Sequence, residues 1–196
     1  MISITEVHID DETEQRVLEV LRSGQLAQGP QVAELERLFA SVHGVEHAIA
    51  VSSGTTALVA ALQALGVGPG DEVVTSPFTF VATLNAILDC GATARFADIG
   101  DDYNVLPDAM GSCIGPSTRA LLPVHLYGTM ADMTPIVDLA TSAGLAIVED
   151  AAQAVGATGH LGASSAGLVV FQPFFIDLDL PTQLTRGDEP DAGEQH

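Results

Sequence analysis

The fold is decided by residues 47–76, which read HAIAVSSGTTALVAALQALGVGPGDEVVTS. The short apolar run at 47–51 predicts a strand, and the apolar residues of 57–65 recur at helical spacing. After the turn GVGPGD, the segment 72–76 predicts a second strand. Strands that are apolar runs rather than alternating patterns are typical of a parallel sheet buried on both faces.

The alternation of strand and helix continues downstream to residue 150, and two helices precede it. Asp10 and Gly24 mark the ends of the first helix, and Pro30 and Gly44 mark those of the second. Further strands are predicted at 92–99, 119–128 and 145–150, and further helices at 80–90, from 107 onward and at 132–144. The sequence therefore predicts an α/β fold with a mainly parallel sheet, helices on both faces and three α/β/α layers.

Composition restricts both the size of the fold and its partners. A chain of 196 residues is long enough for one sizeable hydrophobic core. Its formal net charge is -20, and its six basic residues are all arginine, with no lysine anywhere. Binding to nucleic acid or to an anionic membrane surface requires clustered positive charge. We therefore expect no nucleic-acid partner and no membrane partner.

The sequence carries no targeting or metal signal. The N-terminal segment MISITEVHIDDETEQ has neither a basic region nor an apolar run, so it is not interpreted as a signal peptide. The apolar segments are interrupted well before the ~20 residues that a membrane span needs. Cys90 and Cys113 fit no metal motif and are interpreted as reduced thiols. A cytoplasmic protein without a metal site is the expectation.

A first candidate site is the segment SSGTT at residues 52–56, between the first predicted strand and its helix. Unpaired N–H groups at a helix N-terminus carry partial positive charge and can hold a phosphate. Gly54 permits close approach of a ligand, and the hydroxyl groups of Ser53, Thr55 and Thr56 add donors. The alternative is that Ser53 only caps the helix.

A second candidate is EDAAQ at residues 149–153, which follows the apolar strand at 145–150. A carboxylate at the end of a buried strand is costly unless it has a cationic or hydrogen-bonding partner. In open α/β sheets, ligands bind beyond the carboxyl ends of the strands, where Asp150 is expected. The alternative is an aspartate that caps a loop.

Three aromatic or imidazole side chains fall beside other strand ends. Phe80 follows the strand at 72–76 and could stack on a planar ligand, although core packing is the default for such a residue. His125 and Tyr127 lie near the end of a further strand. Residues of these types in such places more often close hydrogen bonds than catalyse.

Together, these segments resemble a known family. The run GPQVAELERLFASVHGVEHAIAVSSGTTALVAALQALGVGPGDEVVTSPFTFVATLNAIL, followed by PVHLYGTMADM and IVEDAAQAVGA, is similar to the N-terminal part of sugar aminotransferases of the DegT/StrS type. These are pyridoxal-phosphate (PLP) enzymes of fold type I. The resemblance extends from about residue 20 to about residue 165, and it implies the first part of the fold type I large domain.

The resemblance also implies roles for individual residues. Gly54 and Thr55 would bind the phosphate of PLP through backbone N–H groups, and Phe80 would stack on its pyridine ring. Asp150 would pair with the protonated ring nitrogen, and Gln153 would contact the side of the ring that carries the hydroxyl group. The family transfers an amino group, usually from glutamate, to a keto-sugar attached to a nucleotide, and its members are dimers.

The chain departs from the family pattern after this point. Family members carry a Ser-Phe pair soon after the Asp-x-x-Gln element and then the lysine that forms a Schiff base with PLP. Here Gln172-Pro173 stands where Ser-Phe is expected, and Asp177 falls near the position of the lysine. A carboxylate cannot form a Schiff base. Some relatives carry histidine instead, but none lies between His160 and His196.

Two segments are therefore expected: residues 1–165 as a partial PLP-dependent transferase large domain, and residues 166–196 as a divergent segment with an acidic, disordered tail. The first interpretation of function is a nucleotide-sugar aminotransferase of polysaccharide biosynthesis, present as a fragment that has no catalytic residue of its own. A second is one half of a split enzyme, completed by a C-terminal chain that supplies the lysine. A third is a non-catalytic module that binds PLP or a nucleotide sugar, or that dimerises with a full-length relative.

Overall fold

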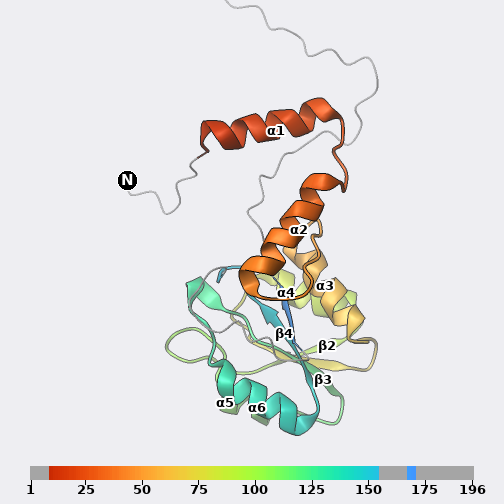
Figure 1. Cartoon of the computed structure of the whole chain (residues 1–196). Coiled ribbons are helices and arrows are strands. Elements are labelled where there is room, and N and C mark those ends of the chain that lie inside the picture. The colour runs from red at the N-terminus through yellow and green to blue at the C-terminus, as the bar shows by residue number, and fades with distance from the viewer. Residues whose placement is uncertain (1–8, 155–166, 171–196) are drawn as a thin grey trace, which may run out of the picture.

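The computed structural model of the protein describes residues 9–154 and 167–170 (Figure 1). Within these ranges the chain forms a parallel sheet with helices on both faces. The elements, in chain order, are α1 (Asp11–Ser23), α2 (Pro30–His43), α3 (Gly54–Ala64), β1 (Glu72–Thr75), α4 (Val81–Asp89), β2 (Thr93–Phe96), α5 (Pro107–Ser112), β3 (Thr118–Leu122), the 3₁₀ turn η1 (Leu126–Gly128), α6 (Met133–Ala143), β4 (Ala146–Asp150) and β5 (Gly167–Val170).

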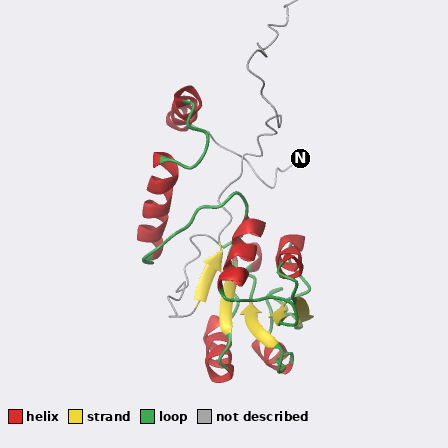
Figure 2. Ribbon diagram, turned by 90° about the vertical axis from the view of Figure 1, so that its right-hand side faces the viewer, coloured by secondary structure: helices red, strands yellow, loops and turns green. Residues whose placement is uncertain are grey.

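The strand order in the sheet is β2-β1-β3-β4-β5, and every neighbouring pair is parallel. The chain moves from β1 to β2 through α4 toward one edge of the sheet, and from β3 to β4 through α6 toward the other. Right-handed crossovers that run in opposite directions place their helices on opposite faces of the sheet. Figure 2 shows helices on both sides of the strands. The predicted α/β class with a mainly parallel sheet is confirmed.

The hydrophobic core lies in two layers, one on each face of the sheet. Neighbouring residues of a strand point to opposite faces: Val73 packs in the layer that contains Leu58 of α3 and Ile87 of α4, whereas Val74 packs in the layer that contains Ile136 of α6. Both valines of β1 are fully buried. Burial on both faces explains why the central strands read as apolar runs rather than as alternating patterns.

The two N-terminal helices begin and end at the predicted residues. The Asp10 side chain accepts a hydrogen bond from the Thr13 N–H at 2.8 Å, and Gly24 ends α1 in the left-handed conformation with φ 70°. Pro30 opens α2, and Gly44 ends it with φ 64°. No side chain of α1 is buried, and Figure 1 shows this helix apart from the sheet. The candidate site therefore depends on the elements from α3 onward.

The prediction of a strand at 47–51 is wrong. This segment has no strand structure in the described part of the chain, and Ile49 is 81% exposed. The N–H of Ala50 donates to Oε1 of Glu36 in α2 at 2.8 Å, so a side chain takes a donor that a neighbouring strand would otherwise use. An apolar run becomes a strand only where the fold supplies a partner, and here a helix lies beside it instead.

Several predictions fall on residues outside the described ranges. These are the tail, the Gln172-Pro173 pair and Asp177. Of the segment 166–196, which the sequence predicts to diverge from the family pattern, the structure describes the strand β5. This strand pairs with β4 from Ile147↔Gly167 to Asp150↔Val170. None of the helices described is long and apolar enough to cross a bilayer.

Candidate functional site

The candidate site lies at the carboxyl ends of β1, β3 and β4. The β1–α4 and β3–α6 connections diverge to opposite faces, so the sheet has its topological switch point between β1 and β3. Loops that diverge in this way leave a crevice beyond the strand ends, where open α/β sheets bind ligands. Phe80 follows β1, Tyr127 follows β3, and Asp150 is the last residue of β4. The fold therefore brings three of the segments singled out in the sequence to one edge of the sheet.

The carboxyl group of Asp150 is buried and held by neutral donors. Its residue is 6% exposed. The hydroxyl of Thr83, on the first turn of α4, donates to Oδ2 at 2.8 Å, and the N–H of Ala152 donates to Oδ1 at 3.3 Å. No arginine forms an ion pair with this carboxylate within the described residues. Asp150 is thus a buried acid without a strong cationic partner in the described part of the protein.

Burial raises the pKa of Asp150 above its ordinary value, because a charged carboxylate is poorly solvated there. The hydrogen bonds from Thr83 and Ala152 act in the opposite direction, but they do not outweigh burial. A carboxylate in this position gains from any cationic group that reaches it. The protonated nitrogen of a heteroaromatic ring is such a group.

Thr83 connects Asp150 to Phe80. Its N–H donates to the carbonyl of Phe80 at 3.1 Å, while its hydroxyl donates to Asp150. Phe80 is the N-cap residue of α4 and is 68% exposed. The alternative of core packing for this ring is therefore wrong. An aromatic ring that is held at a strand end and left exposed can stack on a planar ligand.

The segment SSGTT forms the start of α3 as predicted. The Ser53 hydroxyl accepts from the N–H of Thr56 at 3.1 Å, so Ser53 does cap the helix. This cap leaves the N–H groups of Gly54 and Thr55 without an acceptor among the residues described. Two such donors at a helix N-terminus suit a phosphate group. No hydrogen bond among the described residues ties this segment to Asp150.

Gln153 is fixed to the loop that follows β3. Its Oε1 accepts a hydrogen bond from the N–H of Tyr127 at 2.8 Å. Tyr127 has a left-handed backbone, with φ 53° and ψ 27°, which is uncommon for a residue other than glycine. The sequence gives no sign of this bond, because nothing in the local pattern predicts the backbone conformation of Tyr127.

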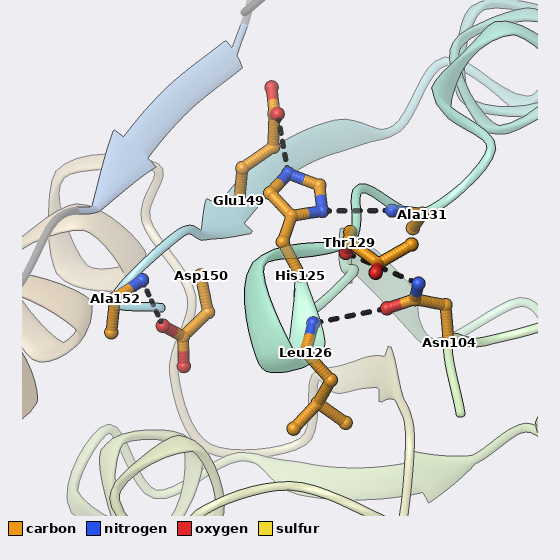
Figure 3. A network of polar contacts seen from close by, with 8 residues as sticks. All are labelled: Asn104, His125, Leu126, Thr129, Ala131, Glu149, Asp150 and Ala152. Carbon is orange, nitrogen blue, oxygen red and sulfur yellow. Dashed lines mark hydrogen bonds and ion pairs between the residues drawn. The ribbon is translucent and has the colours of Figure 1, made fainter. Parts of the chain in front are cut away.

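His125 and Glu149 form a buried pair beside Asp150 (Figure 3). Their Nε2 and Oε2 atoms are 3.0 Å apart, and the two residues are 0% and 3% exposed. Because Nδ1 of His125 accepts from the N–H of Ala131 at 3.2 Å, Nε2 carries the proton and donates to Glu149. The expectation that His125 closes hydrogen bonds is confirmed.

Two polar residues of the site escaped the sequence analysis. Thr83 supports Asp150, and Asn104, which is 2% exposed, holds the loop after β3 through the N–H of Leu126 and the carbonyl of Thr129. The spacing of Thr83, one turn after Phe80 on a helix that starts at a strand end, is a signal that could have found it. Asn104 lies in an irregular segment and offers no such signal.

Replacing Thr83 with valine is expected to raise the pKa of Asp150 further, because the carboxylate loses the donor that stabilises its charged form. The free energy of unfolding should fall by about 1–2 kcal/mol, as for other buried hydrogen bonds that lose one partner. Titration of the Asp150 carboxyl carbon by NMR measures the pKa, and urea unfolding measures the stability. Thr83→Ser keeps the hydroxyl and serves as the control. An unchanged Asp150 pKa in the valine variant would contradict this role.

The described residues fit PLP, the cofactor that the resemblance implies. The buried Asp150 offers a negative charge that lacks a strong cationic partner, the ring of Phe80 is exposed beside it, and the start of α3 presents two unpaired N–H groups. Each feature matches one part of PLP: the pyridinium nitrogen, the ring face and the phosphate. Within the described ranges, no group of three or more His, Cys, Asp or Glu residues could hold a metal ion.

Comparison with known proteins agrees with this geometry. Residues 7–173 match the DegT/DnrJ/EryC1/StrS aminotransferase family. The chain is 47% identical over 151 residues to the spore coat polysaccharide biosynthesis protein SpsC of Bacillus subtilis, covering 76% of this chain and 39% of that protein. It is 41% identical over 169 residues to the GDP-perosamine synthase of Caulobacter vibrioides, covering 85% of this chain and 45% of the synthase.

The chain also resembles part of a protein of known structure. The crystal structure of NtdA from Bacillus subtilis with the bound cofactor PMP matches with a TM-score of 0.72 and 38% identity, over 76% of this chain and 35% of that one. The chain thus spans less than half the length of these relatives. The family match also extends beyond the residues that carry the resemblance, at both ends. The chain belongs to the DegT/DnrJ/EryC1/StrS aminotransferase family.

Proposed function

We propose that this chain forms the cofactor-binding part of a PLP-dependent aminotransferase that acts on nucleotide-linked keto-sugars, with glutamate as the amino donor. The observation that carries the proposal is the buried carboxylate of Asp150, which is held by Thr83 and Ala152 and lacks a cationic partner in the described structure. When bound, PLP supplies an electron sink for the carbon that carries the amino group.

Each residue of the proposed site has a separate task. Asp150 keeps the ring nitrogen protonated, and the low polarity around its carboxylate strengthens that pairing. Phe80 covers one face of the ring. The N–H groups of Gly54 and Thr55 bind the phosphate, and Gln153 faces the ring hydroxyl. We assign these roles from the match of chemistry and position.

The chain has no lysine, so none of its side chains can form the Schiff base that the family uses. We propose that these residues bind PLP non-covalently and do not transfer an amino group by themselves. The family match reaches residue 173. We propose residues 1–165 as the partial large domain and residues 166–196 as a segment that diverges from the family pattern. A cytoplasmic location and a homodimer are parts of the same proposal.

A second possibility is a split enzyme, in which a separate C-terminal chain supplies the lysine. The observation that favours it is that Asp150 and Thr83 are in place to hold a cofactor, whereas the chain has no lysine. A third possibility is a non-catalytic module that binds PLP or a nucleotide sugar, or that dimerises with a full-length relative. Co-purification of a lysine-bearing partner, with an activity that neither chain shows alone, would favour the split enzyme.

The proposal is tested by equilibrium dialysis of the purified chain with PLP and with pyridoxal, which lacks the phosphate. We expect saturable binding of PLP and binding of pyridoxal that is weaker by about tenfold or more, because two N–H donors lose their charged partner. An assay with glutamate, PLP and a nucleotide-linked keto-sugar should show no turnover. Equal affinity for PLP and pyridoxal would contradict the phosphate site, and turnover by the chain alone would contradict the assigned role.

A further inference from the structure

The loop at residues 125–131 is held at both ends by buried polar side chains. At its start, His125 is buried and bonded to Glu149, and its Nδ1 accepts from the N–H of Ala131 at the end of the loop. In the middle, Asn104 accepts from the N–H of Leu126 at 3.1 Å and donates to the carbonyl of Thr129 at 3.2 Å. Figure 3 shows both anchors on the same turn of chain.

These anchors enclose a turn with an unusual backbone. Tyr127 has φ 53° and Gly128 has φ 81°, and Tyr103 is the other non-glycine residue with positive φ in the described ranges. The rings of Tyr103 and Tyr127 contact each other edge to face, with centroids 5.9 Å apart. A residue stays in this conformation only when its surroundings force it to, and such positions concentrate at functional sites.

The left-handed turn directs one backbone donor at the candidate site. The N–H of Tyr127 points to Oε1 of Gln153 at 2.8 Å. Because a backbone N–H can only donate, the atom facing it must be the amide oxygen, which fixes the orientation of the amide group. The NH₂ group of Gln153 is then left to donate elsewhere. In the described part of the structure it has no acceptor.

We propose that the loop 125–131 is a positioning element that fixes the Gln153 amide with its oxygen on the Tyr127 N–H and its NH₂ group turned outward as a donor. The role of this NH₂ group toward the cofactor rests on the proposed function: as a donor, it favours the ionised form of the ring hydroxyl of PLP. His125 and Asn104 act through the loop and touch no ligand, whereas Gln153 is the group that contacts the cofactor.

The orientation of Gln153 can be tested without any cofactor. Two variants of this exposed residue form a matched pair: Gln153→Glu keeps an oxygen that accepts from Tyr127, and Gln153→Leu removes it. In the leucine variant, the N–H of Tyr127 should exchange with solvent about three- to tenfold faster, whereas in the glutamate variant it should exchange as in the wild type. Equal exchange rates in all three proteins would overturn the proposed bond.

The role of the anchors is tested at the same amide. Asn104→Ala should speed exchange at Tyr127 and move the side-chain NH₂ signals of Gln153 toward those of a free glutamine, while Val148 in β4 stays protected. Tyr127→Gly keeps the N–H and tolerates the left-handed backbone, so its Gln153 signals should stay near those of the wild type. Loss of protection at Val148 equal to that at Tyr127 would show that Asn104 only supports the fold, and would overturn the positioning role.

The last step uses bound PLP. In both Gln153 variants the absorbance band of the neutral ring hydroxyl should gain intensity over that of the ionised form, because the donor is gone. An unchanged band ratio would overturn the donor role even if the exchange results hold. If PLP does not bind to the wild-type chain, the proposed function fails, whereas the exchange results still decide the orientation of Gln153.

Discussion

Replacing Asp150 with asparagine is expected to weaken PLP binding by about ten- to a hundredfold, because a charged hydrogen bond to the ring nitrogen is lost. Asparagine has the same shape and keeps an oxygen for the N–H of Ala152. Its NH₂ group can donate to the Thr83 hydroxyl, which can in turn donate to Thr79, 2.9 Å away. Equilibrium dialysis with the wild type and the variant measures the change in affinity. Equal affinities would contradict the pairing of Asp150 with the ring.

The same variant is expected to be more stable without cofactor at neutral pH, by about 1 kcal/mol, as is common where a functional residue is replaced. The pKa of Asp150 is raised in the folded chain above its ordinary 3.8, so the folded state holds this proton more tightly than the unfolded state. The protonated Asp150 therefore adds to the stability of the folded chain below pH 3.8. This contribution is lost as the pH rises through the pKa of Asp150 in the folded chain. The asparagine variant lacks this loss.

Urea unfolding at several pH values measures this difference. The stability gap between Asp150→Asn and the wild type should widen as the pH rises from about 4 toward neutrality, and then stay constant. A gap that narrows over this interval would show that the folded chain stabilises the charged carboxylate, contrary to the effect of burial. Thr83→Ser, which leaves the carboxylate in place, is the matched control.

Replacing His125 with leucine should have the largest effect on stability, a loss of about 3–5 kcal/mol in the free energy of unfolding. Glu149 is 3% exposed, and His125 is the side chain that bonds to it. Without the imidazole, the carboxylate stays buried with no donor from the described residues. A loss of this size is a large part of the total stability of a domain, about 5–15 kcal/mol.

A double variant separates loss of the pair from loss of packing. In His125→Leu/Glu149→Leu both polar groups are gone, and the stability should recover a large part of the loss, because no buried charge is left. Some loss remains, since the N–H of Ala131 no longer has its acceptor. Urea unfolding of both variants and of Glu149→Leu completes the cycle. If the double variant is less stable than His125→Leu, the claim that an unpaired, buried Glu149 destabilises the fold is contradicted.

The features that the sequence predicted well are those with local causes. Helix ends depend on a few neighbouring residues, so the local sequence predicts them. Examples are the caps at Asp10 and Ser53 and the left-handed glycines at positions 24 and 44. Asp150 could be singled out because a carboxylate at the end of an apolar strand is unusual in any fold.

The features that the sequence did not predict depend on contacts between distant segments. Thr83 and Asp150 are 67 positions apart, and Asn104 reaches a loop 22 positions away. The segment 47–51 has the composition of a strand, but the fold places Glu36 beside Ala50 instead of a strand. Pairing and burial decide these cases, and neither is a property of the local sequence.

The most direct test compares the affinity of the chain for PLP with that for pyridoxine phosphate, which has the ring and the phosphate but no aldehyde. Without a lysine, the aldehyde has no side-chain partner in this chain, so the binding rests on Asp150, Phe80 and the N-terminus of α3. We expect both compounds to bind reversibly, with affinities within about threefold of each other, and both to bind more weakly to Asp150→Asn. Absence of saturable binding for both compounds, or an adduct of PLP fixed by borohydride on an internal residue, would contradict a non-covalent cofactor site.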